Sequence, residues 1–208
     1  MSRVFVIADL HFGHRLVAGK RGFAGPDEHD AALCEAWRKV VGKRDVVYVL
    51  GDVFDPSFLR ILPGTKKLAM GNHDRYPVER YTPYFSKIGA CFEFDGCLLT
   101  HIPVHPGQFG RYELNVHGHT HAHFVDDERY VSVSVEHCTR MEPLPLRELI
   151  QARRERLAVA SRFGQQGVRD LDNVCMDFTP GTPEPGHCLG DGHYLCKECV
   201  EFRPEEDR

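Results

Sequence analysis

Short apolar runs that end in a polar, potentially metal-binding side chain recur along the N-terminal part of the chain. The runs RVFVIA, DVVYVLG and KKLAMG each read as a strand, because they are short and largely apolar, and the first two are rich in valine and isoleucine. In open α/β sheets, ligand sites form beyond the carboxyl ends of the strands. We therefore expect a site where these strands end. The side chains found there are Asp9, Asp52, Asn72, His101, and His117 or His119.

Helical patterns alternate with these strands. Residues 26–43 have acidic residues in the first turn and apolar residues on one face, as an amphipathic helix does. A short helical turn is expected at 56–64, and a helix interrupted by Pro83 at 78–89. Asp95-Gly96 joins two apolar runs and predicts a hairpin. Alternating strands and helices indicate an α/β fold.

The amino-acid composition and the pattern of apolar residues change after the MEPLPL segment. We predict a globular domain over residues 1–145, a helix and linker over 146–170, and a Cys-rich tail over 171–208. The net charge of −4 and the pI of about 6.3 argue against a chain-wide basic surface for nucleic acid, although the RRER run at 153–156 is locally basic.

Composition points to a protein of the cytoplasm. The N-terminal apolar run is too short for a signal peptide, and no stretch approaches the roughly 18 apolar residues of a membrane-spanning helix. We therefore expect a cytoplasmic protein that does not enter membranes. In that compartment the 8 cysteines should be reduced, buried or metal-bound rather than disulfide-linked.

Mixed oxygen and imidazole donors are concentrated in a few short motifs. Side chains alternate along a strand, so each Asp-x-His or His-x-His pair should point to one face. A mononuclear site needs three or four ligands, whereas this larger set suits two ions sharing one carboxylate. Such donors without thiolates favour Mn, Fe, Zn or Co over Ca, and paired ions serve in phosphoester cleavage. The candidate ligands are Asp9, His11, Asp52, Asn72, His101, His119 and His121.

The ordered motifs ADLHFGH, LGDVFD, GNHD, THIPVHP and HGHTH resemble the five motifs of calcineurin-like metallophosphoesterases. The resemblance covers roughly residues 3–140 and is strongest to small bacterial and phage members that open with D-x-HFGH. It implies a four-layer α/β/β/α sandwich, to which the small Cys-rich, zinc-binding appendage would be added.

The resemblance also implies a role for each motif residue. Asp52 would bridge the two ions, and a hydroxide between them would attack the phosphate. His73 would donate a hydrogen bond or the leaving-group proton, with Asp74 orienting it. The first ion would be held by Asp9, His11, Asp52 and His121, and the second by Asp52, Asn72, His101 and His119.

Four residues near these motifs are candidate substrate contacts, the alternative being exposed polar side chains. They are His14, Arg15, Arg75 and His105. The segment GDVFDPSF lacks the Arg-Gly of protein Ser/Thr phosphatases, which disfavours a phosphoprotein substrate. We expect a phosphodiesterase or phosphatase acting on a small or nucleotide-type phosphoester. Alternatives are a nuclease acting on DNA or RNA ends and a catalytically silent adaptor.

The tail carries a separate metal-binding pattern. Cys196-x-x-Cys199 has the spacing of a zinc knuckle, and two further thiols precede it. A structural Zn would stabilise a segment that has few apolar residues. Such a zinc module could dock a protein partner, and the alternatives to it are a flexible tail with reduced cysteines or a disulfide pair. The predicted ligands are Cys175, Cys188, Cys196 and Cys199, with His187 and His193 as substitutes for one position.

Overall fold

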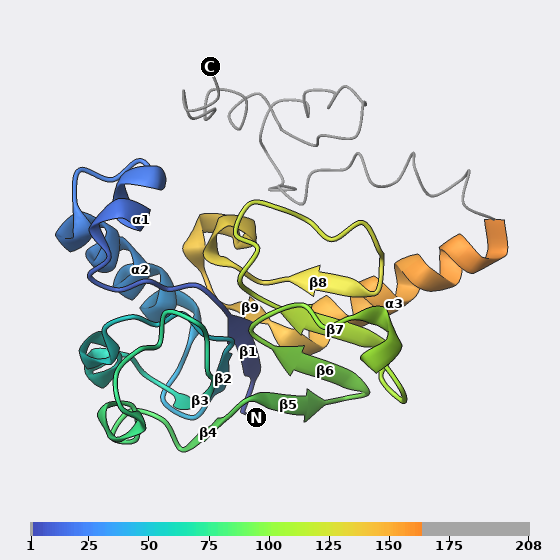
Figure 1. Ribbon diagram of the computed structural model, residues 1–208, viewed down its shortest axis with the longest axis horizontal. Coiled ribbons are helices and arrows are strands. Elements are labelled where there is room, and N and C mark those ends of the chain that lie inside the picture. The colour runs from blue at the N-terminus through green and yellow to red at the C-terminus, as the bar shows by residue number, and fades with distance from the viewer. Residues whose placement is uncertain (1, 164–208) are drawn as a thin grey trace. The chain divides into compact units, whose positions relative to one another are not determined.

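The computed structural model describes residues 2–163, in which two β-sheets lie side by side (Figure 1). The chain through Arg153 forms one compact unit that contains both sheets. The predicted α/β class is confirmed. Residues 171–208, and with them the predicted zinc site, lie outside the described residues.

The first sheet has five strands in the order β4-β3-β2-β1-β9. Four of them are parallel, so their carboxyl ends meet at one edge, whereas β9 runs antiparallel to β1. The strands span Val4–Ile7 (β1), Val46–Val49 (β2), Thr65–Ala69 (β3), Lys87–Gly89 (β4) and Leu144–Pro145 (β9).

The second sheet has four strands in the order β5-β6-β7-β8. The expected hairpin joins β5 and β6, and Asp95 and Gly96 in its turn both have positive φ (48° and 75°), as a type I′ turn requires. The strands β7 and β8 then add in parallel. Their bounds are Cys91–Phe94 (β5), Cys97–Thr100 (β6), Leu114–His117 (β7) and Tyr130–Ser132 (β8).

The two sheets are joined at the end of β1. The Ala8 N–H donates to the Val133 carbonyl at 2.9 Å, and the Val135 N–H donates to the Ala8 carbonyl at 3.1 Å. A parallel bridge pairs Ala8 with Ser134. This junction brings the end of the first sheet against the segment that follows β8.

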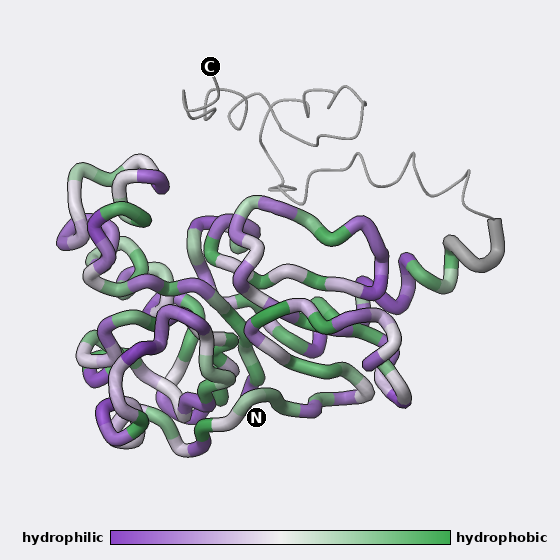
Figure 2. The backbone as a smooth tube through the Cα atoms, viewed as in Figure 1, coloured by the Kyte–Doolittle hydropathy of each residue, from purple (hydrophilic) through white to green (hydrophobic). Residues whose placement is uncertain are grey.

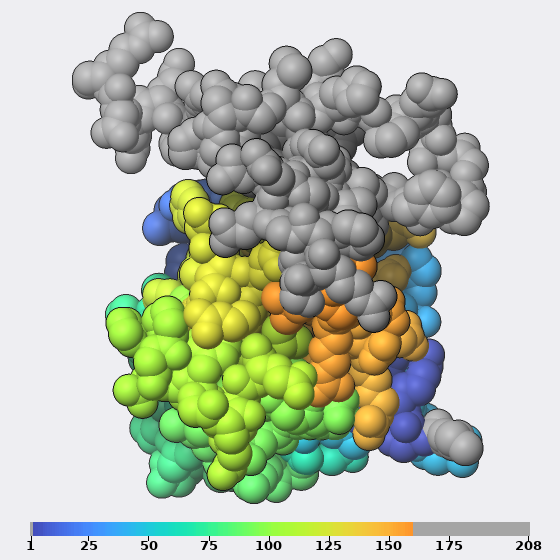
Figure 3. Space-filling model, turned by 90° about the vertical axis from the view of Figure 1, so that its right-hand side faces the viewer, coloured from blue at the N-terminus to red at the C-terminus, as the bar shows by residue number. Residues whose placement is uncertain are grey.

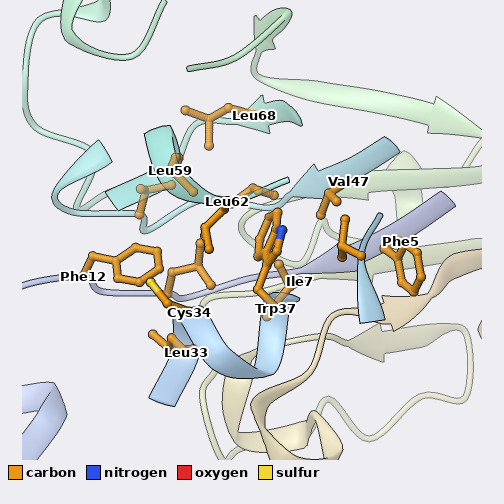
Figure 4. Packing of buried hydrophobic residues seen from close by; sticks show 14 of the residues in the cluster. Phe5, Ile7, Phe12, Leu33, Cys34, Trp37, Val47, Leu59, Leu62 and Leu68 are labelled. Atoms are coloured by element: carbon orange, nitrogen blue, oxygen red, sulfur yellow. The ribbon is translucent and has the colours of Figure 1, made fainter. Parts of the chain in front are cut away.

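Helix α2 (Pro26–Val40) covers the first sheet. Pro26 begins it at a position where no N–H is needed, and Asp27 and Glu28 favour its positive N-terminal end. Its buried face sets Leu33 and Trp37 against the apolar side chains of β1 and β2 (Figure 4). Figure 2 shows the hydrophobic residues gathered in the strands, and hydrophilic ones in the connecting segments.

The other helices are short or lie at the end of the described chain. Helix α3 (Leu146–Phe163) starts beside the second sheet, where the Arg147 guanidinium lies 5.0 Å from the Phe94 ring centroid (Figure 3). Within residues 2–163, no helix combines the length and apolar character needed to cross a membrane. The remaining elements are α1 (Arg15–Lys20) and the 3-10 helices η1 (Pro56–Ile61), η2 (Val78–Arg80), η3 (Pro106–Gln108), η4 (Val135–His137) and η5 (Thr139–Met141).

The helix predicted over residues 78–89 is wrong. Only η2 forms there, and the segment ends as strand β4 on the edge of the first sheet. Pro83 lacks the N–H that a helix interior needs. The backbone N–H and hydroxyl of Ser86 instead donate to the Lys66 carbonyl at 2.8 and 2.9 Å, which draws the segment onto β3.

Candidate metal centre

The residues beyond β1, β2 and β7 turn in a left-handed backbone conformation. This corrects the expectation that strand pleating aligns the Asp-x-His and His-x-His pairs, because the pairs lie past the strand ends. Positive φ is uncommon outside glycine and persists where surrounding structure imposes it. Five candidate ligands have it: Asp9 (59°), His11 (50°), Asp52 (54°), His119 (72°) and His121 (49°).

Three glycines allow these turns to approach one another closely. A Cβ on Gly71 would lie 2.3 Å from Asp52 Oδ1, and one on Gly51 would lie 2.5 Å from His101 Nδ1. A Cβ on Gly118 would lie 2.5 Å from the Ala8 Cβ and 2.7 Å from Asp9 Oδ2. The turns that follow β2, β3 and β7 can therefore pack this closely only because glycine has no side chain at these three positions.

One cluster of ligand atoms comes from Asp9, His11 and His121, and these atoms lie within 4.8 Å of one another. His11 is 1% exposed, and neither of its ring nitrogens has a hydrogen-bond partner. Burial lowers the pKa of His11 to about 2, so the ring is neutral and has a free lone pair. Burial also raises the pKa of Asp9 to about 6, a cost that a bound cation would offset.

A second cluster comes from Asp52, His101 and His119, whose ligand atoms also lie within 4.8 Å of one another. The His101 Nδ1–H donates to the Leu50 carbonyl at 2.8 Å, so in the neutral ring Nε2 is the unprotonated nitrogen. That Nε2 lies 3.2 Å from His119 Nδ1 and 2.9 Å from Asn72 Oδ1. Potential ligand atoms from three side chains thus converge on one place.

Asp52 lies between the two clusters. Its Oδ2 is 3.5 Å from His11 Nε2, and its Oδ1 is 3.4 Å from His101 Nε2. The backbone N–H of His73 donates to Oδ1 at 2.8 Å and holds the carboxylate in place. All seven side chains expected as ligands are therefore brought together, with one carboxylate facing both groups.

The residues present fit divalent metal ions. Buried polar atoms are normally hydrogen-bonded, and the unpartnered ring nitrogens of His11 are an exception that a ligand would explain. The donors are imidazoles, carboxylates and one amide, with no thiolate, which suits Mn, Fe, Zn or Co.

Two further imidazoles stand beside the first cluster. The His73 ring centroid lies 5.2 Å from that of His11 and 6.0 Å from that of His14. His14 caps α1 by accepting the Val17 N–H on Nδ1 at 3.4 Å, so its Nε2 remains free to meet another group. His73 thus lies next to His11, and ring nitrogens of His11, His14 and His73 lie within 4.8 Å of one another.

Asp74 does not do what the motif led us to expect. Its carboxylate accepts hydrogen bonds from the backbone N–H groups of Gly71, Asp52, Val53 and Phe54 at 2.8–3.4 Å. These bonds join the loop after β2 to the loop after β3, and none of them goes to the His73 ring. Burial raises the pKa of Asp74 against the opposing effect of these amides. Asp74 supports the turn that carries Asp52.

The other predicted substrate contacts lie on exposed loops and helix ends. Arg15 is exposed on α1, and exposed Arg75 donates from Nε to the Asn72 carbonyl at 3.4 Å. His105 caps η3 by accepting the Gly107 N–H at 3.1 Å. The predicted tail ligands Cys175, Cys188, Cys196, Cys199, His187 and His193 lie outside the described residues.

Sequence reasoning missed Arg21 and Glu136, which meet at the first cluster. Glu136 Oε1 lies 2.9 Å from His121 Nδ1 and 2.9 Å from Arg21 Nε. Burial alone would raise the pKa of Glu136, but the His121 bond and the Arg21 charge bring it to about 2. Neither residue belongs to a recurring motif, so no local signal in the sequence distinguishes them.

Comparisons with known proteins match this chain to a family model and to two phage proteins. Residues 2–137 match the family model described as calcineurin-like phosphoesterase. The Gene 66 protein of Mycobacterium phage D29 is 44% identical over 98 residues, which cover 42% of this chain and 49% of that protein. The Gene 66 protein of Mycobacterium phage L5 is 40% identical over 91 residues, covering 38% and 44%. The chain thus spans about half the length of the phage relatives it matches.

The fold also recurs among solved structures. A protein of unknown function from Aquifex aeolicus superposes with a TM-score of 0.56 at 24% identity, over 73% of this chain and 100% of that one. That likeness shows a shared fold, and the family match spans most of the compact unit that contains the two His/Asp clusters. The chain therefore belongs to the calcineurin-like phosphoesterase family.

Proposed function

We propose that the protein hydrolyses phosphoesters with the help of two divalent ions. The observation that carries this proposal is the position of Asp52, whose two carboxylate oxygens face separate imidazole clusters at 3.5 and 3.4 Å. A single ion would need only three or four of the seven donors. The first ion would be held by Asp9, His11, Asp52 and His121, and the second by Asp52, Asn72, His101 and His119.

The four-layer α/β/β/α sandwich of this family belongs to the same proposal. The two sheets would form the inner layers. On the outside, α2 packs on the first sheet and the start of α3 contacts the second. Such an arrangement leaves the carboxyl ends of the strands open to a substrate.

The chain's own groups would divide the chemistry between them. When bound, the ions would lower the pKa of water and neutralise the phosphate charge. His73 would donate a proton to the oxygen of the leaving group, since its ring lies beside the cluster and is not needed as a ligand. His14, with Nε2 free, would hydrogen-bond a phosphate oxygen from the same side.

The substrate would be a small or nucleotide-type phosphoester. The net charge of −4 provides no broad basic surface for a long nucleic acid. Whether monoesters or diesters are preferred is decided by assay. The metal-stripped protein is reloaded with Mn²⁺ and given p-nitrophenyl phosphate and bis(p-nitrophenyl) phosphate in parallel.

We expect turnover of at least one aryl ester, dependent on Mn²⁺ and abolished by a chelator. Asp52→Asn should remove that turnover, because it removes the charged group shared by both clusters. If protein with two bound ions turns over neither ester, the proposal is wrong and a catalytically silent adaptor is the better account.

A further inference from the structure

Arg21 is a buried cation at the edge of the proposed metal centre. Its side chain is only 7% exposed, and all three guanidinium nitrogens have partners. Nη2 donates to the Asp9 carbonyl at 2.7 Å, and Nη1 donates to the Leu10 carbonyl at 3.3 Å. The Arg21 side chain therefore stabilises the left-handed turn that begins at Asp9 by hydrogen bonds to two of its carbonyl groups.

The hydrogen bonds of Arg21 form a network with three branches, and the second branch connects the same turn to helix α2. Arg21 Nη1 lies 2.9 Å from His29 Nε2 and can only donate, so the His29 proton is on Nδ1. That Nδ1–H donates to Asp30 Oδ1 at 2.8 Å, and Asp30 Oδ2 accepts the Gly13 N–H at 2.8 Å. The network thus holds the backbone on both sides of His11.

The third branch reaches the other ligand of the first cluster. Glu136 accepts from Arg21 Nε, and it also accepts the His121 Nδ1–H at 2.9 Å. In the neutral ring, this proton on Nδ1 makes Nε2 the unprotonated nitrogen of His121. Carboxylates that hold a ligand histidine in this way orient the ring and raise its basicity.

The second cluster is held differently. Its His101 donates from Nδ1 to the Leu50 carbonyl, a backbone group at the end of β2. Within residues 2–163, the side-chain hydrogen bonds of Arg21 and Glu136 go to the Asp9 and Leu10 carbonyls, His29, His121 and each other, and none goes to Asp52, His101 or His119. The two halves meet where the His119 N–H donates to the Asp9 carboxylate at 2.9 Å, but the His101 ring has a support of its own, separate from Arg21 and Glu136.

We propose that Arg21 and Glu136 are positioning residues for the Asp9–His11–His121 half of the centre, and that the Asp52–His101–His119 half does not depend on them. This inference rests on the proposed two-ion function. It predicts that changes at either residue weaken one metal site and leave the other intact.

Calorimetric titration of the metal-stripped full chain with Mn²⁺ tests this prediction. Glu136→Ala should weaken one of the two sites by about 10–100-fold, the usual effect of losing such a partner, while the second site keeps its affinity. Glu136→Gln retains an acceptor for His121 and should recover part of the loss. Arg21→Met should act like Glu136→Ala.

A matched control uses an ion pair on the protein surface. Glu93 and Arg111 pair where their side chains are 56% and 73% exposed, so Glu93→Ala removes a carboxylate of the same kind without touching the centre. Both Mn²⁺ affinities should stay at the wild-type values in this variant. Thermal melting of each metal-free variant shows whether it is folded.

The histidine tautomer gives a readout that needs no metal. In ¹⁵N spectra of the metal-free protein, at a pH where the ring is neutral, His121 should be protonated on Nδ1. Glu136→Ala should move His121 toward a mixture of tautomers while His101 is unchanged. Unchanged tautomers, or equal weakening of both metal sites, would overturn the inference.

The outcomes for function and for positioning can be told apart. Wild-type protein that binds two ions but cleaves no aryl ester would contradict the proposed function and leave the positioning result readable from the titration. Conversely, active protein in which Glu136→Ala weakens neither site would contradict only the positioning of His121.

Discussion

The Asp52 carboxylate faces both histidine clusters, and the groups around it explain why it stays in place. It is 1% exposed and accepts the His73 backbone N–H, while its own N–H donates to Asp74. A buried carboxylate is costly unless a cation lies nearby. At the scale of single residues, the centre is therefore arranged for positive charge.

His73 is the residue whose role can be separated from metal binding. We predict that His73→Asn lowers turnover of the reactive ester by about 10²–10⁴-fold, the usual contribution of a general acid. The side chain is assigned to the leaving group, so metal content should remain at the wild-type level. Elemental analysis beside a steady-state assay checks both, and a matching loss of metal would refute the assignment.

Single residues differ in how far the sequence foretells their roles. The seven candidate ligands are recognisable because donor side chains occur in short motifs beside glycines. Asp74 is misread, since its motif position suggests a partner for His73 while its bonds go to backbone amides. Arg21 is 115 residues from its partner Glu136, so only the folded chain reveals that pair.

At the scale of elements, the centre depends on how closely β1, β2 and β7 end beside one another. Gly118 follows β7 directly and leaves room for Ala8 and Asp9 at the end of β1. Because the same junction joins the two sheets, a small change of backbone position there should displace ligands from both.

Adding one methyl group tests this close approach. Gly118→Ala should cost several kcal/mol or lose the metal sites, because overpacking alone costs about 1–3 kcal/mol and the new Cβ would meet Asp9 Oδ2 at 2.7 Å. The control is Gly19→Ala in α1, where a Cβ meets nothing within 4 Å. Chemical denaturation compares the two, and equal stability would show that the junction is not tight.

Asp45, which directly precedes β2, forms hydrogen bonds with Arg3, which directly precedes β1. It accepts the Arg3 N–H at 2.8 Å, the Gly42 N–H at 2.9 Å and the Arg3 guanidinium at 3.0 Å. The backbone bond from Arg3 and that from Gly42 lower the pKa of the Asp45 carboxyl below its usual 3.8. A carboxyl with a lowered folded-state pKa stabilises the fold above its unfolded-state pKa and loses that effect as pH falls.

We therefore expect Asp45→Asn to reduce the free energy of unfolding by about 1–3 kcal/mol above roughly pH 5. The gap between wild type and variant should close as the pH drops below 3.8 and through the lower folded-state value. Urea unfolding of the metal-free proteins across this range measures the gap. If the difference in free energy of unfolding between wild type and Asp45→Asn grew as the pH fell, the prediction would be wrong.

The sequence predicts those helices and strands whose own residues carry a clear capping, periodicity or turn pattern. Helix α2 has a proline start, acidic first turn and apolar face, and the β5–β6 hairpin has its Asp-Gly turn. The strands β4 and β9 have 3 and 2 residues and no alternation of their own. They form only because a neighbouring strand offers its unpaired edge, which is tertiary information.

At the scale of the whole molecule, the family match ends at residue 137, and the chain continues into a Cys-rich tail. The Asp9–His11–His121 and Asp52–His101–His119 clusters are both built from side chains between residues 9 and 121. Any metal bound in the tail would be a third ion, chemically distinct because thiolates would hold it.

A double substitution tests the tail. Cys196→Ser with Cys199→Ser should lower the zinc content by one equivalent per chain and leave ester hydrolysis unchanged, since the proposed ligands for catalysis are elsewhere. Cys91→Ser, at an exposed single cysteine, is the control and should lose no zinc. If the wild type, the double variant and Cys91→Ser all contain the same amount of zinc, the proposed tail site is wrong.

The central claim is that one chain binds two ions and that both are needed for phosphoester cleavage. Its most direct test is to titrate metal-stripped protein with Mn²⁺ while recording bound metal and the rate of aryl ester hydrolysis on the same samples. We predict that activity rises to its maximum only as binding approaches two equivalents at the centre, with Asp52→Asn inactive throughout. Full activity at one equivalent, or none at two, would contradict the two-ion account.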